Sequence, residues 1–300
     1  MQEIVQSVGI DIGTSTTQLV FSRLVIENLA GSYAVPRVSI VEKEVVYRSP
    51  IYFTPLLSST EIDAEGVKRI VREQYAAAGM KPSDLQTGAV IITGDTARKP
   101  NANQALAALS DMAGDFLLAT AGPDLESVLS ARGAGTDQIS ENERTVVANI
   151  DVGGGTSNIA LFEKGTLRGV SCLDIGGRLI KIQDGKITWI FPKLQDFARK
   201  RGIALAPGDR ADPDTLFRVC EHMADQLAQA LFLKPQDAEH PGLYTNGGTS
   251  IPPQPAVRGV TFSGGVADYI YQPATEDVFR YGDIGVLLGR AIRQHPAFGQ

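Results

Sequence analysis

The sequence contains few residues of the kinds that build disulfides or cysteine-rich metal sites. Only two of its 300 residues are cysteine, Cys172 and Cys220, and they lie far apart. Such sparse thiols are typical of buried side chains without a chemical role, and they predict neither a disulfide framework nor a cysteine-ligated metal. The composition of 43% hydrophobic and 21% charged residues instead suits one or two globular domains with their own cores.

Long apolar segments and excess positive charge are also missing. No stretch is long enough to cross a bilayer, and the N-terminus lacks the basic-then-apolar pattern of a signal peptide, so we expect a cytoplasmic protein without membrane contact. The net charge of −6 argues against a nucleic-acid partner.

Two turns rich in glycine and threonine share one layout. In each, an apolar run reaches an aspartate, a Gly/Ser/Thr turn follows, and a second apolar run comes next, over residues 8–21 and 149–162. This pattern predicts two β-hairpins. Glycines at such a tip let successive N–H groups point into one concavity and hold an anion, and the hydroxyls add donors. The predicted phosphate-binding residues are Gly13, Thr14, Ser15, Thr16, Gly153, Gly154, Gly155 and Thr156.

An aspartate stands at the mouth of each predicted tip, Asp11 in the first and Asp151 in the second. A carboxylate alone would repel phosphate, but proteins hold Mg²⁺ with one or two carboxylates together with substrate phosphates. The pair therefore favours a Mg²⁺-nucleotide, with both aspartates as candidate metal ligands and catalytic residues. One such turn taken alone is equally compatible with a tight hairpin that binds nothing, whereas two copies favour the nucleotide.

A third glycine element, residues 259–270, predicts a short strand, a turn at Gly264 and Gly265, and a helix start. Without side chains there, a flat adenosine could lie against the backbone, although the segment alone is a common strand-to-helix junction. Together the three elements resemble the two phosphate motifs and the adenosine motif of the actin-like ATPase superfamily, from residue 8 to about 294. The resemblance implies ATP and Mg²⁺ as cofactors and a two-domain α/β actin-like ATPase (ribonuclease H-like) fold, with the nucleotide cleft between the domains.

The alternation of strands and helices agrees with an α/β fold. We expect domain I over residues 1–145 with the first hairpin, and domain II over 146–300 with the second hairpin and the adenosine motif. The last helix of domain II, about 283–294, carries small residues suited to close helix packing and would return toward domain I. Within domain I the pattern also predicts a hairpin over 35–47 and a helix that Asp63 caps.

The helix predicted over 124–132 offers a candidate for the chemical step. It resembles the actin segment whose glutamine orients the attacking water, and Glu126 occupies that position here. A carboxylate could orient or deprotonate water beside a γ-phosphate, because phosphoryl transfer is mostly positioning and charge stabilisation. The alternative is an exposed helix glutamate without a catalytic role.

One segment indicates a particular family within this superfamily. Residues 93–99 read Thr-Gly-Asp-Thr-Ala-Arg-Lys, which is similar to a segment of the ethanolamine ammonia-lyase reactivating factors, the EutA family, and segments 121–127 and 172–178 resemble the same family. The resemblance implies a chaperone-like Mg²⁺-dependent ATPase. Its client is the adenosylcobalamin enzyme ethanolamine ammonia-lyase, from which it releases damaged cobalamin.

The resemblance carries further expectations. Chains of this family continue well beyond the second connecting helix, so we expect the family's C-terminal part to be missing from this sequence. A bacterial cytoplasmic location, association with the ethanolamine microcompartment and a dimer are all compatible with it, and the sequence leaves the oligomeric state open. No cobalamin-binding histidine motif is present, so the corrinoid should belong to the client. An iron–sulfur dehydratase activator of the superfamily would need cluster-ligating cysteines.

Other activities would keep the same phosphate hairpins. A small-molecule kinase would add an acidic base for its acceptor, for which Asp174 and Asp95 are candidates, although each is equally a turn residue. A polyphosphate or nucleotide phosphatase would need no protein client, and a filament-forming actin relative would be structural. A pseudo-ATPase would bind nucleotide without cleaving it.

Overall fold

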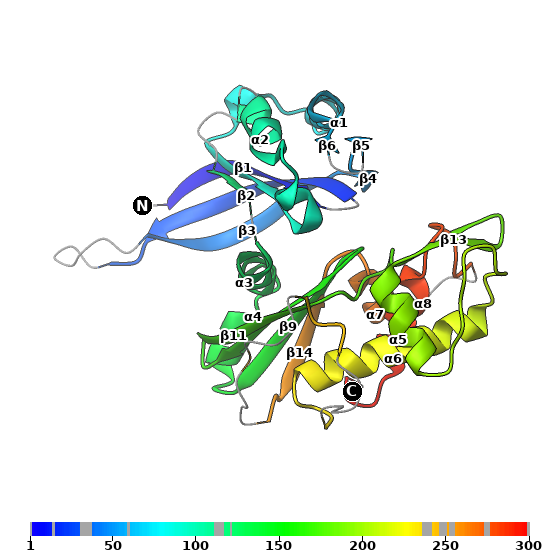
Figure 1. Cartoon of the computed structure of the whole chain (residues 1–300). Coiled ribbons are helices and arrows are strands. Elements are labelled where there is room, and N and C mark those ends of the chain that lie inside the picture. The colour runs from blue at the N-terminus through cyan, green and yellow to red at the C-terminus, as the bar shows by residue number, and fades with distance from the viewer. Residues whose placement is uncertain are drawn as a thin grey trace. The chain divides into compact units, whose positions relative to one another are not determined.

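The computed structural model describes residues 2–13, 16–30, 38–58, 61–110, 117–120, 122–235, 242–245, 251, 256–272 and 277–298, without the side chains at 95, 98, 110, 120 and 123. Contacts between residues divide the chain into two compact units, Met1–Gly122 and Pro123–Gln300 (Figure 1). The division expected from the sequence lies near residue 145. The helices between 123 and 142 belong to the second unit by contact, because they pack on its sheet.

A mixed sheet with the strand order β3-β2-β1-β7-β8 forms the first unit. Its antiparallel part is β1 (Gln2–Ile12), β2 (Thr16–Asn28) and β3 (Val38–Arg48), with the short β4 (Tyr52–Phe53) pairing with the start of β2. The strands β7 (Thr87–Ile92) and β8 (Leu117–Thr120) continue the sheet in parallel to β1. The short strands β5 (Leu56–Ser58) and β6 (Glu61–Ile62) pair with each other.

Two helices, α1 (Ala64–Ala77) and α2 (Ala102–Ser110), contribute to the core of the first unit. In the sequence they are separated by two short 3₁₀ turns, η1 (Pro82–Asp84) and η2 (Gly94–Arg98). Alternate residues of β1, such as Val8 and Ile10, point into this core, as the period of two in a strand requires. The predicted cap is confirmed, because Asp63 accepts a hydrogen bond from the N–H of Gly66 at 2.9 Å and so satisfies one free donor of the helix start.

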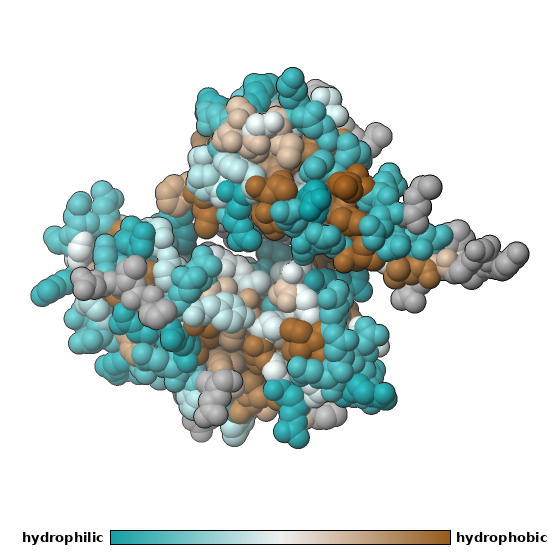
Figure 2. Space-filling view, turned by 180° about the vertical axis from the view of Figure 1, so that it is seen from behind, coloured by the Kyte–Doolittle hydropathy of each residue, from teal (hydrophilic) through white to brown (hydrophobic). Residues whose placement is uncertain are grey.

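The hairpin predicted over 35–47 is wrong where the structure describes it, because residues 38–48 form the single strand β3. The expected hairpin consisted of strands over 35–41 and 44–47, with Glu42 and Lys43 between them. Arg23 on β2 instead pairs with Glu42 at 3.7 Å and Glu44 at 2.7 Å, which favours one continuous strand. The exposed apolar side chains of β3 are Val38, Ile40, Val41, Val45 and Val46. Figure 2 shows, for one face of the molecule, that hydrophobic and hydrophilic surface alternate.

The sheet of the second unit has the order β11-β10-β9-β14. The antiparallel strands are β9 (Val146–Val152), β10 (Ser157–Glu163) and β11 (Thr166–Leu173), and β14 (Gly259–Ser263) runs parallel to β9. This order repeats β3-β2-β1-β7 of the first unit. An antiparallel meander followed by a parallel strand is the ribonuclease H-like arrangement, so the expected α/β fold occurs once in each unit. A separate hairpin joins β12 (Ile180–Gln183) and β13 (Lys186–Ile190).

The helices of the second unit are α3 (Pro123–Gly133), α4 (Thr136–Asn142), α5 (Pro192–Lys200), α6 (Pro213–Ala230), α7 (Ala267–Tyr271) and α8 (Gly285–Gln294). α3 and α4 pack on β9, β10 and β11, whereas α8 packs on α6 and α7. The close packing predicted for the small residues of the last helix is confirmed at Gly289, where a Cβ would collide with Tyr269. Within the described residues, no helix is long and apolar enough to span a membrane.

Candidate nucleotide site

Both glycine turns form the predicted hairpins, and the same hydrogen bond closes each tip. The N–H of Gly13 donates to the carbonyl of Thr16 at 2.8 Å, and the N–H of Gly153 donates to the carbonyl of Thr156 at 2.9 Å. The two tips therefore have the same length and closure although their sequences differ. Two predicted residues of the first tip lie outside the described part of the chain, Thr14 and Ser15.

The aspartates at the two mouths each accept a hydrogen bond from a neighbouring hydroxyl. Thr93, directly after β7, donates to Oδ1 of Asp11 at 3.2 Å. Ser263, the last residue of β14 and the register partner of Asp151, and Ser130 of α3 both present a hydroxyl to the Asp151 carboxyl and favour its charged form. The carboxylates are thus held in place by groups from outside their own hairpins.

The surroundings of Asp151 raise the pKa of its carboxyl. Burial raises this pKa most, and the hydrogen bonds from Ser263 and Ser130 oppose the shift by favouring the charged form. A nearby cation would stabilise the carboxylate that burial disfavours. Carboxylate oxygens are ligands that Mg²⁺ accepts in proteins, so the side chain of Asp11 and that of Asp151 each offer a donor that fits this ion.

Two threonines outside the predicted motif support the first tip. The carbonyl of Gly13 accepts hydrogen bonds from Thr54 at 2.8 Å and from Thr96 at 3.1 Å, and Thr96 is fully buried. Thr96 and Thr93 both belong to the 93–99 segment that carried the family resemblance. The segment therefore has a physical role that sequence reasoning missed, which is to hold the tip and its aspartate.

Backbone contacts from residues 176–178 support the second tip. The N–H of Gly177 donates to the carbonyl of Gly153 at 3.0 Å, and the N–H of Arg178 donates to that of Gly154 at 2.7 Å. Gly176 lies so close to Gly154 that a Cβ would collide with its backbone. At Gly155, by contrast, no described atom lies within 4 Å of the position a Cβ would take. That side of the tip has room for a ligand.

The third glycine element adjoins the second tip. Gly264 has a φ of +85°, and a Cβ there would collide with the carboxylate of Asp151 and the backbone of Val152. The N–H of Val266 donates to the carbonyl of Val152 at 3.1 Å. Around Gly265, however, no described atom lies within 4 Å of a Cβ position, which is compatible with a flat ligand lying there.

Glu126 lies on α3, one turn before Ser130. Residues four apart share a helix face, so Glu126 and the hydroxyl that reaches Asp151 project from the same side of α3. The Ser130 hydroxyl also lies 2.9 Å from the backbone carbonyl of Glu126. Within the second unit the structure thus brings Asp151 and Gly264 together beside the second tip, and places Glu126 one helical turn from Ser130.

Asp174 has structural partners on both carboxylate oxygens. Lys193 contacts Oδ2 at 2.6 Å, and the hydroxyl of Thr245 donates to Oδ1 at 2.8 Å. Lys193 also donates to the carbonyl of Tyr244 at 2.6 Å. The carboxylate therefore ties the 242–245 segment to the end of β11, which does not favour a role as a kinase base. The side chain of Asp95, the other candidate base, lies outside the described residues.

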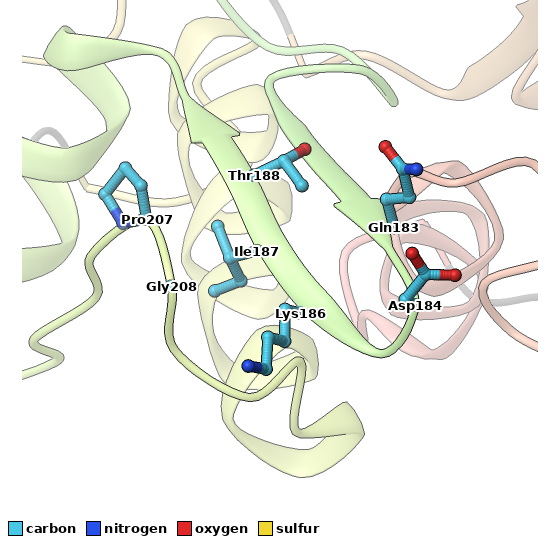
Figure 3. Close-up of a pocket in the computed structure, with 7 residues that line it drawn as sticks. All are labelled: Gln183, Asp184, Lys186, Ile187, Thr188, Pro207 and Gly208. Atoms are coloured by element: carbon cyan, nitrogen blue, oxygen red, sulfur yellow. The ribbon is translucent and has the colours of Figure 1, made fainter.

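A surface pocket of about 490 Å³ lies on the β12–β13 hairpin and the neighbouring 207–208 segment (Figure 3). Its lining consists of Gln183, Asp184, Lys186, Ile187, Thr188, Pro207 and Gly208. None of the residues predicted to bind nucleotide lines this pocket.

Two ribonuclease H-like units, each with a glycine hairpin and an aspartate at its mouth, define a protein of the actin-like ATPase class. Within that class, the model of the family described as Ethanolamine utilisation protein EutA matches residues 3–300, and the chain belongs to this family.

Two relatives carry the description ethanolamine ammonia-lyase reactivase EutA. The protein from Escherichia coli K12 is 39% identical and the protein from Salmonella typhimurium LT2 is 38% identical, each over 97% of this chain. The chain spans 62% of the length of either relative.

Solved structures show weaker likeness. The Ppx/GppA enzyme of Aquifex aeolicus is 14% identical with a TM-score of 0.48, covering 89% of this chain and 70% of that one. The ethanolamine utilization protein EutJ of Carboxydothermus hydrogenoformans is 20% identical with a TM-score of 0.43, covering 97% and 89%. The fold assignment therefore rests on the strand order in the two sheets rather than on these likenesses.

Proposed function

We propose that this protein is a chaperone-like ATPase that reactivates ethanolamine ammonia-lyase in the bacterial cytoplasm by releasing damaged cobalamin. Membership of the EutA family over residues 3–300 supports the client, as do two relatives described as reactivases of this lyase. The repeated hairpin is the observation that supports nucleotide binding. The same hydrogen bond closes it in both units, and each time an aspartate beside a hydroxyl group stands at its mouth.

The proposed site assigns a task to each group. The N–H and hydroxyl groups of the two tips would bind the phosphates of ATP, and Asp11 and Asp151 would hold Mg²⁺, which when bound neutralises phosphate charge. Gly264 and Gly265 would lie along the adenosine. Glu126 would orient the attacking water, and this positioning is the main demand that phosphoryl transfer makes on a protein.

The link to the client follows from differential binding. A protein that adopts different states with ATP and ADP can remodel a partner that binds those two states with different affinity. The free energy available for remodelling cannot exceed the difference between the two binding free energies. In the proposed cycle the lyase binds one state of the ATPase more tightly and opens enough to lose its damaged corrinoid.

The decisive experiment mixes cobalamin-inactivated ethanolamine ammonia-lyase with this chain and Mg²⁺-ATP and measures corrinoid in the filtrate. We expect nucleotide-dependent release that is lost with Asp11→Ala. ATP binding is measured in parallel by calorimetry. Absence of release from a chain that binds ATP would refute reactivation by this chain alone, and absence of ATP binding would refute the site itself.

A further inference from the structure

A row of hydrogen bonds leads from helix α4 to the aspartate of the second tip. The hydroxyls of Thr136 and Thr261 lie 2.6 Å apart, and Thr261 donates to Oδ1 of Asn149 at 2.9 Å. The side-chain amide of Asn149 then donates to Oγ of Ser263 at 3.0 Å. Ser263 is the register partner of Asp151 on the neighbouring parallel strand, and its hydroxyl favours the charged form of the Asp151 carboxyl. Hydrogen bonds therefore join four side chains from α4, β14 and β9, and the last of them lies beside Asp151.

An ionised Asp151 carboxylate, the form that a bound cation favours, would fix the direction of every bond in this row. A carboxylate only accepts, so the single proton of the Ser263 hydroxyl would then point to Asp151. The oxygen of Ser263 must then accept, which orients Asn149 with its NH₂ toward Ser263 and its carbonyl toward Thr261. Thr261 donates to that carbonyl, so Thr136 donates to Thr261. All four bonds run toward the carboxylate, and bonds aligned in this way strengthen one another.

Part of the row is buried, and its geometry follows from the sheet. Thr136 and Asn149 are fully buried, whereas Thr261, Ser263 and Asp151 are partly exposed. Asn149 and Asp151 are two residues apart on β9 and so share a face, as do Thr261 and Ser263 on β14. The opposite face of the same strands carries Ile150 and other core residues. A buried polar group needs a partner to avoid a desolvation penalty, so each member of the row depends on the next.

The fold itself does not require this row. In the first unit Gly9 stands two residues before Asp11, where Asn149 stands before Asp151, and Gly9 pairs with Ala89 on the parallel strand. The same strand arrangement thus forms without a buried amide or a threonine at these two positions. The polar row is a property of the second unit alone, which points to a task at Asp151 rather than to general stability.

We propose that Asn149, Thr261 and Thr136 are positioning residues that hold the Asp151 carboxylate in one orientation through Ser263, and so transmit the placement of α4 to the metal-binding end of the site. Only the second part of this proposal, the transmission from α4 to the metal-binding end, rests on the proposed nucleotide function. The orientation of Asp151 is a property of the chain without any ligand and can be tested separately.

The first test needs no nucleotide. The chain is labelled with ¹³C at the aspartate carboxyl carbons, and the Asp151 resonance is assigned by its loss in Asp151→Asn. We expect Thr136→Val to move this resonance, because the first donor is removed, and Thr136→Ser to restore it. Ser140→Ala is the matched control, since Ser140 is a buried hydroxyl on the same helix that donates to the carbonyl of Thr145 at 2.7 Å. An Asp151 resonance that stays in place in Thr136→Val would overturn the proposal.

The second test measures nucleotide dissociation constants in Mg²⁺ and in EDTA. We expect Thr261→Val and Thr136→Val to weaken binding about three- to tenfold in Mg²⁺ and less than about twofold in EDTA, with Thr261→Ser restoring wild-type affinity. Equal losses in both conditions would mean that these residues only stabilise the unit, and would overturn the positioning role. If the wild-type chain binds no nucleotide, the proposed function fails, and the carboxyl resonance alone decides the inference.

Discussion

The hydroxyl of Thr93 donates a hydrogen bond to Oδ1 of Asp11 at 3.2 Å. Ser263 makes the corresponding contact with Asp151 in the second unit. Each hydroxyl comes from the end of the strand that runs parallel to the strand of its aspartate. Two units with different sequences thus hold a carboxylate at the mouth of a glycine tip in the same way, which is the arrangement expected if both carboxylates serve one function.

Removal of either aspartate should weaken Mg²⁺-dependent nucleotide binding. In Asp11→Ala and Asp151→Ala we expect at least about a tenfold rise in the dissociation constant in Mg²⁺, because a carboxylate ligand of the ion is lost. Titration of Mg²⁺ at fixed nucleotide measures this. Asp196→Ala, which removes an exposed carboxylate paired with Arg199 at 2.9 Å, is the control and should have no effect. Unchanged Mg²⁺ titrations in both aspartate variants would rule out the proposed clamp.

The two glycines of the third element should respond differently to a side chain. Gly265→Val places its side chain into open space and should lower ATP affinity while the chain stays folded, because adenosine would meet the new methyl groups. Gly264→Ala should instead destabilise the second unit by about 1–3 kcal/mol, because the φ of +85° strains an L-residue and the Cβ collides with Asp151. Calorimetry and urea unfolding separate the two effects. Normal ATP affinity in Gly265→Val would mean that this turn is only a junction.

Replacement of Glu126 should separate hydrolysis from binding. Glu126→Gln keeps the size of the side chain but removes its negative charge, so we expect turnover to fall at least tenfold with little change in ATP affinity. Asp124→Asn changes an exposed acid in the first turn of the same helix and serves as the control. Single-turnover phosphate release measures the rate of hydrolysis, and equilibrium binding measures the affinity for ATP. Turnover equal to wild type would leave Glu126 an ordinary helix residue.

Local patterns in the sequence were enough to predict the two glycine hairpins and the helix that Asp63 caps. The turn at Gly153 and the capped helix after Asp63 depend on residues close together in the chain, so their residue types and spacing specify them. The strand β3 was misread for the opposite reason. The charged pair at 42–43 separates the two expected strands, and only the pairing of Arg23, on a different strand, with Glu42 and Glu44 favours one continuous strand.

The supports of the site depend on contacts between distant segments, which a single sequence does not show. Thr54 and Thr96 reach the carbonyl of Gly13 from segments far along the chain. Asn149 lies in an apolar strand, and only the register of β14 beside β9 shows that its amide lies between Thr261 and Ser263. Such residues could be suspected as polar interruptions in buried strands, but their partners come from the tertiary structure.

The kinase alternative makes a distinct prediction at Asp174. If this carboxylate were an acceptor base, Asp174→Asn would abolish transfer to a sugar while Lys193→Met would not. Because Lys193 and Thr245 occupy both oxygens, we expect the two variants to lower the free energy of unfolding by a similar amount, about 1 kcal/mol, and to leave ATP turnover unchanged. Urea unfolding and ATPase assays test this. Sugar-dependent turnover that disappears only in Asp174→Asn would support the kinase.

The start of helix α6 should make the second unit sensitive to acid. The hydroxyl of Thr215 and then its backbone N–H hold the pKa of Asp212 below its ordinary value, with hydrogen bonds of 2.6 and 2.9 Å. The folded state therefore takes up this proton at lower pH than the unfolded chain, whose aspartates titrate near about 3.9. The stabilisation is present above that pH and is lost as the pH falls through the folded pKa.

Asp212→Asn isolates this effect, because asparagine caps a helix as well as aspartate but does not titrate. We expect the wild type to be more stable than Asp212→Asn near neutral pH, and the difference to shrink as the pH falls below about 4. Thr215→Val should remove most of the pH dependence of this difference, since the hydroxyl is the main cause of the lowered pKa. Urea unfolding at several pH values measures the comparison. A difference that stays constant down to acid pH would show that the charge of Asp212 contributes nothing to the helix start.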